Sequence, residues 1–222
     1  PDGLLGVVVA FGSIIAPEIL QHAPMINIHY SALPRWRGAA PVERAILEGD
    51  NTTAVCIIQV VEQLDAGDVL ASAPCAIRED DSVAGLRDRL GHLALPLLID
   101  ICNNGVSSQQ AQVGDVVIAR KISTNDLAIA WSSSPDQISR QVRLGNAFTF
   151  FEGKRFKVHE VSRVSEQLPE GSISFKDGMV LVGTREGSLQ LLTVQPEGKP
   201  RIAASEWARG ARLTNASAFS DR

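Results

Sequence analysis

Two polar residues stand two positions apart in an otherwise apolar stretch, MINIH at residues 25–29. Successive side chains of a strand alternate between its faces, so Asn27 and His29 would share one face. An amide N–H can donate to an oxygen that gains negative charge, and an imidazole can move a proton near neutral pH. A histidine in an apolar strand is more often a hydrogen-bonded structural residue. Its amide neighbour and the Pro- and Gly-rich loop that follows favour a site instead.

Asp65 adds a carboxylate from a distant part of the chain, in the stretch EQLDAGD at residues 62–68. It lies in a short link between two apolar runs, where an ordinary turn aspartate is the simpler interpretation. If the tip of that hairpin folds back over the sheet, Asp65 reaches His29 and favours the charged form of the imidazole. An amide, an imidazole and a carboxylate suit acyl transfer, which needs no Ser or Cys when the substrate's own amine attacks.

The elements that would position these residues begin with a parallel pair of strands. The apolar runs at 4–11 and 25–29 are separated by a short helix from Pro17 to about Gln21, and such a crossover predicts parallel pairing. Open sheets of this kind bind ligands at the carboxyl ends of their strands, which is where the Asn-x-His pair falls.

The remainder of the first half predicts further helices and a hairpin. The expected elements are a helix at 41–49, antiparallel strands at 53–61 and 68–77, a helix from Ser82 to Ile101 that bends near Pro96, and a polar linker at 105–115.

The second half differs in composition and charge. After a helix at 134–143, five short apolar runs separated by turn signals predict a small all-β barrel or sandwich. Residues 1–119 carry 6 Lys and Arg against 14 Asp and Glu, whereas residues 120–222 carry 15 against 11. We therefore expect two domains, 1–115 and 116–222, with the second facing an anionic partner. The alternative is that the excess of positive charge is simply a solvated surface.

Composition narrows the class of protein. The 222 residues are 45% hydrophobic and 21% charged, as in ordinary globular proteins. No apolar run is long enough to span a bilayer, and the N-terminus lacks the features of a signal peptide, so no membrane partner is expected. Cys56, Cys75 and Cys102 lie far apart and have no His at metal-ligand spacing. They indicate buried thiols in the reducing cytoplasm and no metal site.

The residues around the Asn-x-His pair resemble a known family. The stretch NIHYSALPRWRGAAPVERAILEGD at 27–50, followed by LDAGD at 64–68, is similar to the folate-dependent formyltransferases. The resemblance continues more weakly through ARKIS, IAW and the β-rich half. It implies an α/β fold, in which an incomplete Rossmann-like formyltransferase domain precedes a small OB-like β-barrel domain. It also implies that the family's N-terminal part, with the first strands of the sheet, is missing from this chain.

The resemblance also implies a reaction. Similar enzymes move a formyl group from N10 of 10-formyltetrahydrofolate to the amino group of methionine on initiator tRNA, for translation initiation. By this resemblance Asn27, His29 and Asp65 are the catalytic residues. The residues expected to hold the folate co-substrate are Phe11, Gly12, Ser31, Leu33, Pro34, Glu62, Gln63 and Leu64. The second domain would contact tRNA through a basic face supplied by Arg120, Lys121, Lys154, Arg155 and Lys157. No metal is implied, and a monomer is expected at full length.

Several positions depart from the family pattern. Ala66 stands where a Thr is expected after the catalytic Asp, and Ala54 stands where Gly is usual. Two alternatives therefore stay open. The chain could be a related folate enzyme that formylates a sugar amine or hydrolyses the formyl donor. It could also be an inactive truncated fragment that only binds RNA or folate.

Overall fold

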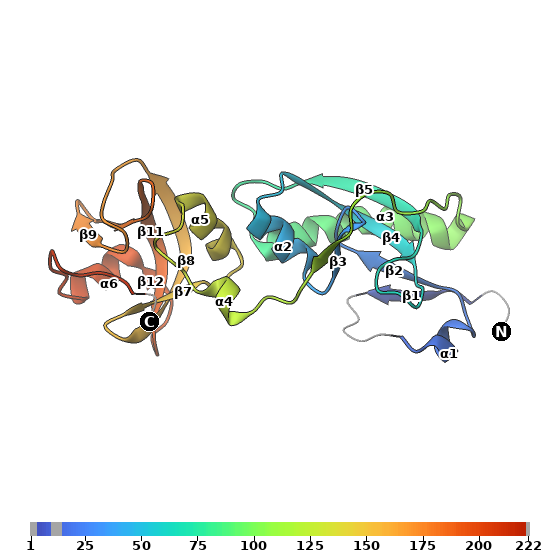
Figure 1. Cartoon of the computed structure of the whole chain (residues 1–222), viewed down its shortest axis with the longest axis horizontal. Helices are drawn as coiled ribbons and strands as arrows, with labels where there is room; N and C mark the ends of the chain where they lie inside the picture. Colours follow the sequence, from blue (N-terminus) through green and yellow to red (C-terminus); the bar gives the residue numbers. More distant parts are fainter. Residues whose placement is uncertain (1–3, 10–14, 221–222) are drawn as a thin grey trace. The chain divides into compact units, whose positions relative to one another are not determined.

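The computed structural model describes residues 4–9 and 15–220 (Figure 1). The chain divides into two compact units, and the boundary along the sequence lies between Lys121 and Ile122. Each unit has its own sheet and its own hydrophobic core. The strand β6 (Val117–Ala119) follows the expected linker and pairs with β3 (Arg35–Gly38), so it belongs to the first unit.

A four-stranded sheet of order β1-β2-β4-β5 forms the centre of the first unit. The predicted parallel pair is confirmed, because β1 and β2 run parallel with Val8 opposite Asn27. The predicted hairpin is also confirmed, because β4 and β5 pair antiparallel along most of their length. The bounds of these strands are β1 Gly6–Val9, β2 Met25–His29, β4 Thr52–Gln59 and β5 Val69–Ala76.

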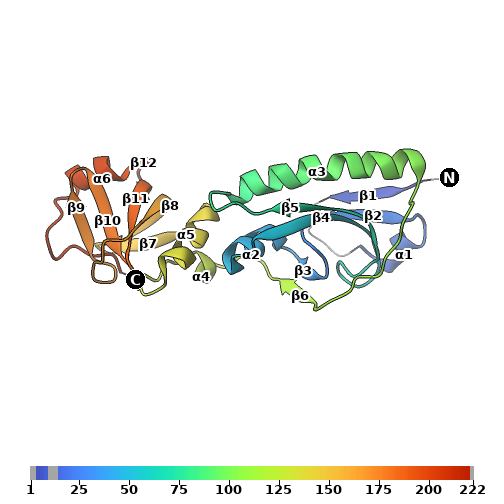
Figure 2. The same cartoon turned by 90° about the horizontal axis from the view of Figure 1, so that it is seen from above.

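Three helices accompany this sheet, and each begins or ends where the sequence predicts. They are α1 (Pro17–Leu20), α2 (Pro41–Glu48) and α3 (Val83–Asn104). The left-handed Gly49 (φ 76°) ends α2, and the side chain of Ser82 caps α3 by accepting from the Gly85 N–H. Figure 2 shows α3 lying along one face of the sheet. Its Ile101 packs there with Ile26 and Ile57 in one apolar cluster.

The pair β3 and β6 is an element that the sequence analysis missed. The stretch RWRG looks like part of a Pro- and Gly-rich loop, and Trp36 (φ 67°) and Gly38 (φ 117°) both leave the ordinary strand conformation. The register shifts at Trp36, so Arg35 opposes Val117 and Arg37 opposes Ile118. A strand this short and irregular forms only because a partner some eighty positions later supplies its hydrogen bonds, which no local pattern reveals.

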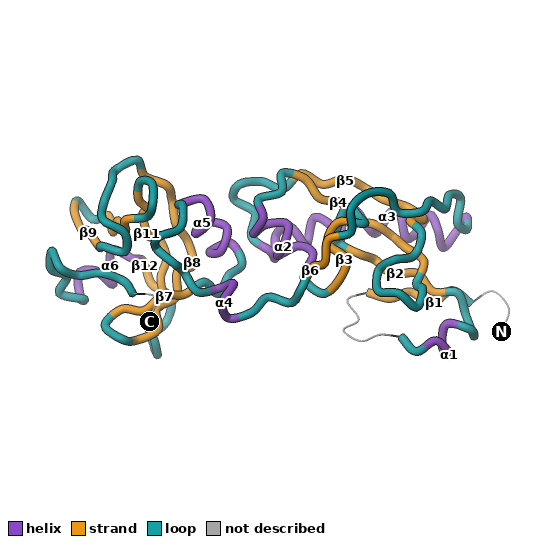
Figure 3. The backbone as a smooth tube through the Cα atoms, viewed as in Figure 1, coloured by secondary structure: helices purple, strands orange, loops and turns teal. Residues whose placement is uncertain are grey.

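The second unit is a six-stranded antiparallel sheet that closes into a barrel. The strands β7, β8, β11, β10 and β9 follow one another in that order, and β12 pairs with β11. The C-terminal residues 217–220 connect the two edges, because Ser220 exchanges two backbone hydrogen bonds with Phe150 of β7 and Ser217 accepts from Ile173 of β9. Figure 3 shows the strands of this unit in orange. The strand bounds are β7 Phe148–Phe151, β8 Lys154–Val164, β9 Ile173–Lys176, β10 Met179–Gly183, β11 Ser188–Pro196 and β12 Ile202–Ala203.

Aromatic side chains fill this barrel. Trp207 of α6 (Ala204–Gly210) stacks on Phe219 with ring centroids 5.9 Å apart, and Phe156 of β8 lies within 5.0 Å of both rings. The predicted helix α5 (Pro135–Arg143) is confirmed, with Ser134 and Gln137 forming a capping box. A one-turn helix, α4 (Thr124–Leu127), precedes it. Within the described ranges 4–9 and 15–220, no helix is both long and apolar enough to cross a membrane.

Replacing Gly183 by Ala is expected to destabilise the barrel by about 1–3 kcal/mol, because an added methyl group would overpack the site. A Cβ on Gly183 would lie 2.1 Å from the Pro169 carbonyl oxygen and 2.6 Å from that of Leu168. The midpoint of urea unfolding, followed by the fluorescence of the buried tryptophans, measures the change. Gly210→Ala is the matched control, because nothing lies within 4 Å of its added Cβ. Equal midpoints for the Gly183 variant and the unaltered chain would contradict the packing argument.

Candidate active site

The carboxyl end of β2 positions Asn27 and His29. These residues pair with Ile58 and Cys56 of β4 on one side, and Asn27 also pairs with Val8 of β1 on the other. His29 is buried, whereas Asn27 is half-buried. At Asn27 the strand is thus paired on both edges. The side chains of Asn27 and His29 lie on the face toward the loop that joins β4 to β5.

Asp65 lies on that loop and meets both side chains. Its Oδ1 accepts from Asn27 Nδ2 at 3.2 Å, and its Oδ2 lies 3.5 Å from His29 Nδ1. The same Oδ2 accepts from the backbone N–H of Gly38 at 2.9 Å. Asp65 itself has φ 48°, a left-handed conformation in which Asp is among the better tolerated residues. The structure therefore brings the three predicted side chains together around one carboxylate.

The second ring nitrogen of His29 is also engaged. Its Nε2 lies 2.8 Å from the carbonyl oxygen of Trp36, and a carbonyl can only accept, so Nε2 carries a proton. The other nitrogen faces the Asp65 carboxylate, so only the doubly protonated ring can donate toward both neighbours. The 3.5 Å distance from Nδ1 to the carboxylate exceeds the length of about 2.7–2.9 Å of a charge-assisted hydrogen bond.

Trp36 is fixed in its left-handed conformation by Asp50. The indole Nε1 donates to Asp50 Oδ2 at 2.7 Å, and Arg35 donates to both oxygens of the same carboxylate. The Arg35 guanidinium also lies 4.4 Å above the indole ring. Ser31 Oγ donates to the Arg35 carbonyl at 2.7 Å. Together these contacts fix the Trp36 carbonyl in the position where His29 donates to it.

A pocket of about 80 Å³ opens beside Asn27 and Asp65. Its other walls are mostly apolar side chains and the segment that follows β4: Val8, Ile15, Ile58, Gln59, Val60, Val61, Glu62 and Leu64. A pocket that combines apolar walls with a few polar side chains is typical of small-molecule sites.

The predicted folate-binding residues divide into three groups. Glu62 and Leu64 line the pocket. Gln63, Ser31, Leu33 and Pro34 are not among its lining residues, and Leu33 instead packs against a cluster that contains Cys56. Phe11 and Gly12 lie outside the described residues.

The neighbouring thiol is unsuited to act as a nucleophile. Cys56 sits opposite His29 in the sheet and is buried, and burial raises the pKa of its thiol. A thiol with a raised pKa stays protonated and unreactive near neutral pH. Among residues 4–9 and 15–220 there is also no group of three or more His, Cys, Asp or Glu side chains that could hold a metal ion.

The site also contains residues that the sequence analysis did not single out. Trp36 and Asp50 hold the His29 ring, the Gly38 N–H holds Asp65, and Gln112 contacts the Asp65 loop from the expected linker. A glycine between RWR and AAP signals unusual backbone geometry, but it does not reveal which side chain its N–H contacts. Gln112 lies in a polar stretch that carries no local signal.

A half-buried carboxylate that contacts an amide and an imidazole beside a pocket is an arrangement suited to acyl transfer, and comparison with known proteins identifies the family. Residues 4–101 match the family formyl transferase, and residues 121–212 match the formyl transferase C-terminal domain. The chain belongs to the formyl transferase family.

Curated relatives within this family share one name. The methionyl-tRNA formyltransferase of Corynebacterium diphtheriae is 36% identical over 217 residues, which cover 93% of this chain and 70% of the relative. The methionyl-tRNA formyltransferase of Methylococcus capsulatus is also 36% identical, over 219 residues, with the same two coverages.

Solved structures confirm the α/β formyltransferase fold. HypX from Aquifex aeolicus in complex with tetrahydrofolic acid superposes with a TM-score of 0.71 at 17% identity, covering 91% of this chain and 38% of HypX. The methionyl-tRNA formyltransferase from Clostridium thermocellum gives a TM-score of 0.60 at 18% identity, with coverages of 86% and 77%. The sugar 3N-formyl transferase WlaRD gives 0.62 at 18% identity, with coverages of 87% and 73%.

Proposed function

We propose that this protein transfers a formyl group from 10-formyltetrahydrofolate to the amino group of methionyl initiator tRNA, in the cytoplasm, for translation initiation. The observation that carries the proposal is the Asp65 carboxylate, which contacts both Asn27 and His29 and lines a pocket together with Asn27. The curated relatives at 36% identity support the choice of tRNA, and a folate-bound structural neighbour supports the choice of donor.

The pocket suits a folate. Its apolar side chains would pack against a flat pterin ring, and the Glu62 carboxylate would meet the polar edge of that ring. Asn27 and Asp65 line the same pocket, and the formyl group would lie beside them.

In this mechanism the methionine nitrogen attacks the formyl carbon, and the bond from that carbon to N10 then breaks. The amide of Asn27 has two N–H groups, and Asp65 takes one of them, so the other is left to donate to the formyl oxygen as negative charge develops there. When its ring carries both protons, His29 adds positive charge to the same region. Asp65 accepts the proton that the attacking amine loses and passes it to N10 as the bond between N10 and the formyl carbon breaks.

Mass spectrometry of methionyl-tRNA tests the proposal directly. The chain, and a version extended at its start with the corresponding segment of a relative, are incubated with 10-formyltetrahydrofolate and methionyl-tRNA. We expect a mass increase of one formyl group on the methionine. An amino sugar replaces the tRNA in a parallel reaction, and a third reaction without acceptor measures release of formate. Formylation of the sugar alone, release of formate alone, or no product from either version would contradict the proposal.

The second unit presents basic side chains that suit an RNA backbone. Arg155, Lys157 and His159 alternate with buried Phe156 and Val158 along β8, so all three project from the outer face of the barrel. Arg155 also lies over the Phe148 ring at 3.6 Å.

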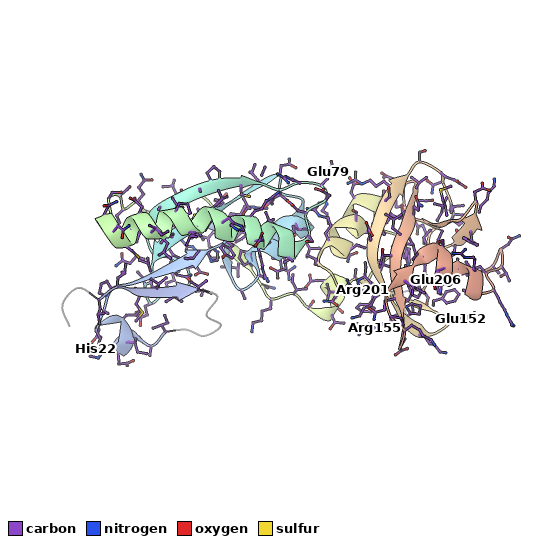
Figure 4. The ribbon with its side chains drawn as sticks, turned by 180° about the vertical axis from the view of Figure 1, so that it is seen from behind. His22, Glu79, Glu152, Arg155, Arg201 and Glu206 are labelled. Atoms are coloured by element: carbon purple, nitrogen blue, oxygen red, sulfur yellow. The ribbon has the colours of Figure 1, made fainter. Side chains whose placement is uncertain are left out.

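Burial and nearby positive charges both lower the pKa of His159. Burial lowers the pKa of His159, the hydrogen bond with Gln195 opposes that effect, and the charges of Arg201 and Lys157 lower the pKa further. Arg155 and Arg201 are labelled in Figure 4 on one side of the second unit. Of the other predicted contacts, Lys154 shares β8, whereas Arg120 and Lys121 fall in the first unit.

Binding of methionyl-tRNA is expected to weaken steeply as salt rises, because contacts between cationic side chains and phosphates release condensed counterions. Replacing Lys157 by Gln is expected to reduce the slope of log K against log salt by roughly 0.7–0.9, the value for one lost phosphate contact. Fluorescence titrations of the whole chain at several KCl concentrations measure the slope. Lys176→Gln, on β9, is the matched control. Binding that stays constant between low and moderate salt would contradict a contact made through phosphates.

A further inference from the structure

Residues 109–112, in the stretch that the sequence analysis treats as a polar linker, hold the β4–β5 hairpin. Gln110 forms an antiparallel bridge with Val69 at the start of β5, through two backbone hydrogen bonds of 2.8 and 3.0 Å. The Gln109 amide donates to Asp68 Oδ2 at 2.9 Å and to Gln59 Oε1 at 3.3 Å. The segment is therefore bound along the hairpin just beyond the loop that carries Asp65.

Gln112 makes the contacts that reach this loop. Its Nε2 donates to the carbonyl oxygens of Asp65 and Gly67, both at 2.8 Å. Its Oε1 accepts from Arg37 Nε at 2.9 Å and from Arg37 Nη2 at 2.7 Å. Both amide hydrogens and both lone pairs of the carbonyl oxygen are thus used, which fixes the orientation of the side chain.

Arg37, which holds the Gln112 side chain, lies next to two other contacts of the site. In β3 it stands between Trp36, whose carbonyl accepts from His29, and Gly38, whose N–H donates to Asp65. The pair Gln112–Arg37 therefore joins the backbone of the Asp65 loop to the strand that holds both His29 and the Asp65 carboxylate.

The backbone of the loop that carries Asp65 is conformationally restricted at Asp65 and at Gly67. Asp65 holds a left-handed backbone conformation, which is disfavoured for a residue with a Cβ. Gly67 packs so closely on β4 that an added Cβ would lie 1.9 Å from the Gln59 carbonyl oxygen. The Gln112 donors bond the carbonyls of these same two residues, and so hold the loop in the conformation that aims the carboxylate at Asn27 and His29.

We infer that Gln112, clamped by Arg37, is a positioning residue for formyl transfer, and that it acts through Asp65. It is not among the residues that line the pocket, and its donors and acceptor are already engaged by the Asp65 loop and Arg37. The inference rests on the proposed function, since the reaction it supports is the one proposed above.

Steady-state kinetics and the ¹⁵N NMR signals of the His29 ring test this role in the full chain. Gln112→Ala is expected to lower kcat about 10²-fold with little change in KM for the folate, because a shift of about 1 Å in a reacting group costs about that much. The ¹⁵N NMR signals of the His29 ring are expected to move as its contact with Asp65 lengthens. Gln112→Glu, which keeps an acceptor for Arg37 but loses both donors, should behave like Gln112→Ala. The double variant with Arg37→Ala should lose no more than the single variants do.

Gln110→Ala is the matched control, because it removes an amide from the same segment while keeping the backbone bridge to Val69. It should keep both the wild-type kcat and the wild-type His29 signals. If Gln112→Ala matches this control in both readouts, the inference is overturned. If Gln112→Ala does not fold, Gln112→Glu is judged by the same two readouts. An unaltered chain that forms no formyl-methionyl-tRNA contradicts the proposed function instead, and the His29 signals then still decide whether Gln112 positions Asp65.

Discussion

Replacing His29 by Ala, or Asp65 by Asn, is expected to slow formyl transfer by about 10²–10⁴-fold, the contribution that a positioned proton-transfer group makes. The Asp65 carboxylate accepts from Asn27 and Gly38 and faces the His29 Nδ1. An Asn at position 65 keeps the shape, but it has one acceptor oxygen where the carboxylate has two. The N–H₂ group of that asparagine would therefore face one of these N–H donors, and the hydrogen bond there would be lost. Single-turnover transfer from 10-formyltetrahydrofolate to methionyl-tRNA measures the loss.

Two further measurements show that such a loss is chemical. Circular dichroism and the thermal midpoint should show that both variants keep the fold, and equilibrium binding of the folate should change little, because the apolar walls of the pocket are untouched. His92→Ala is the matched control for the imidazole, since His92 is exposed on α3 and contacts the carbonyl and side chain of Asp88. Turnover near that of the unaltered chain in either site variant would remove that residue from the mechanism.

Asn27→Ala is expected to reduce the rate of the chemical step by about 10²–10³-fold, which corresponds to about 3–4 kcal/mol of lost transition-state stabilisation. The amide is the donor that lines the pocket, and Asp65 holds it in orientation through a 3.2 Å hydrogen bond. Because the charge on the formyl oxygen grows only in the transition state, the loss should fall on kcat rather than on KM for the folate.

Asn104→Ala provides the comparison for this amide. That side chain donates to Asp100 at the end of α3, away from the pocket, so its removal should leave the rate unchanged. An Asn27 variant that raises KM while keeping kcat would show that the amide binds the ground state, and the assignment of Asn27 to the formyl oxygen would be wrong.

Local pattern was sufficient to predict the elements with strong periodicity or clear end signals. The Val-rich run in β1, the helix bracketed by Pro41 and Gly49, and the apolar spacing of α3 all appear as predicted. The pairing of β3 with β6 could not be predicted in this way, because it depends on a contact between Arg35 and Val117. A bulge at Trp36 also removes the alternation by which a strand is recognised.

Some residues of the candidate site could likewise be predicted from local pattern, and others could not. Asn27 and His29 interrupt an apolar strand, so a simple alternation of side chains places them on one face. Asp65 could be suggested as their partner only through the resemblance or through a hairpin that folds back, and the 3.2 Å bond to Asn27 now joins them. Gln112 and Asp50 act through backbone carbonyls and an indole nitrogen, contacts that exist only once the chain has folded.

The central claim is that the side chains of Asn27, His29 and Asp65 work as a unit on one carbonyl carbon. Single-turnover rates for the three alanine variants, the three pairs and the triple variant test it most directly. The account predicts an active unaltered chain, and a triple variant no slower than the slowest single variant, because residues that act together are lost together. Rate losses that multiply from one variant to the next, or a triple variant that still turns over at the unaltered rate, would contradict it.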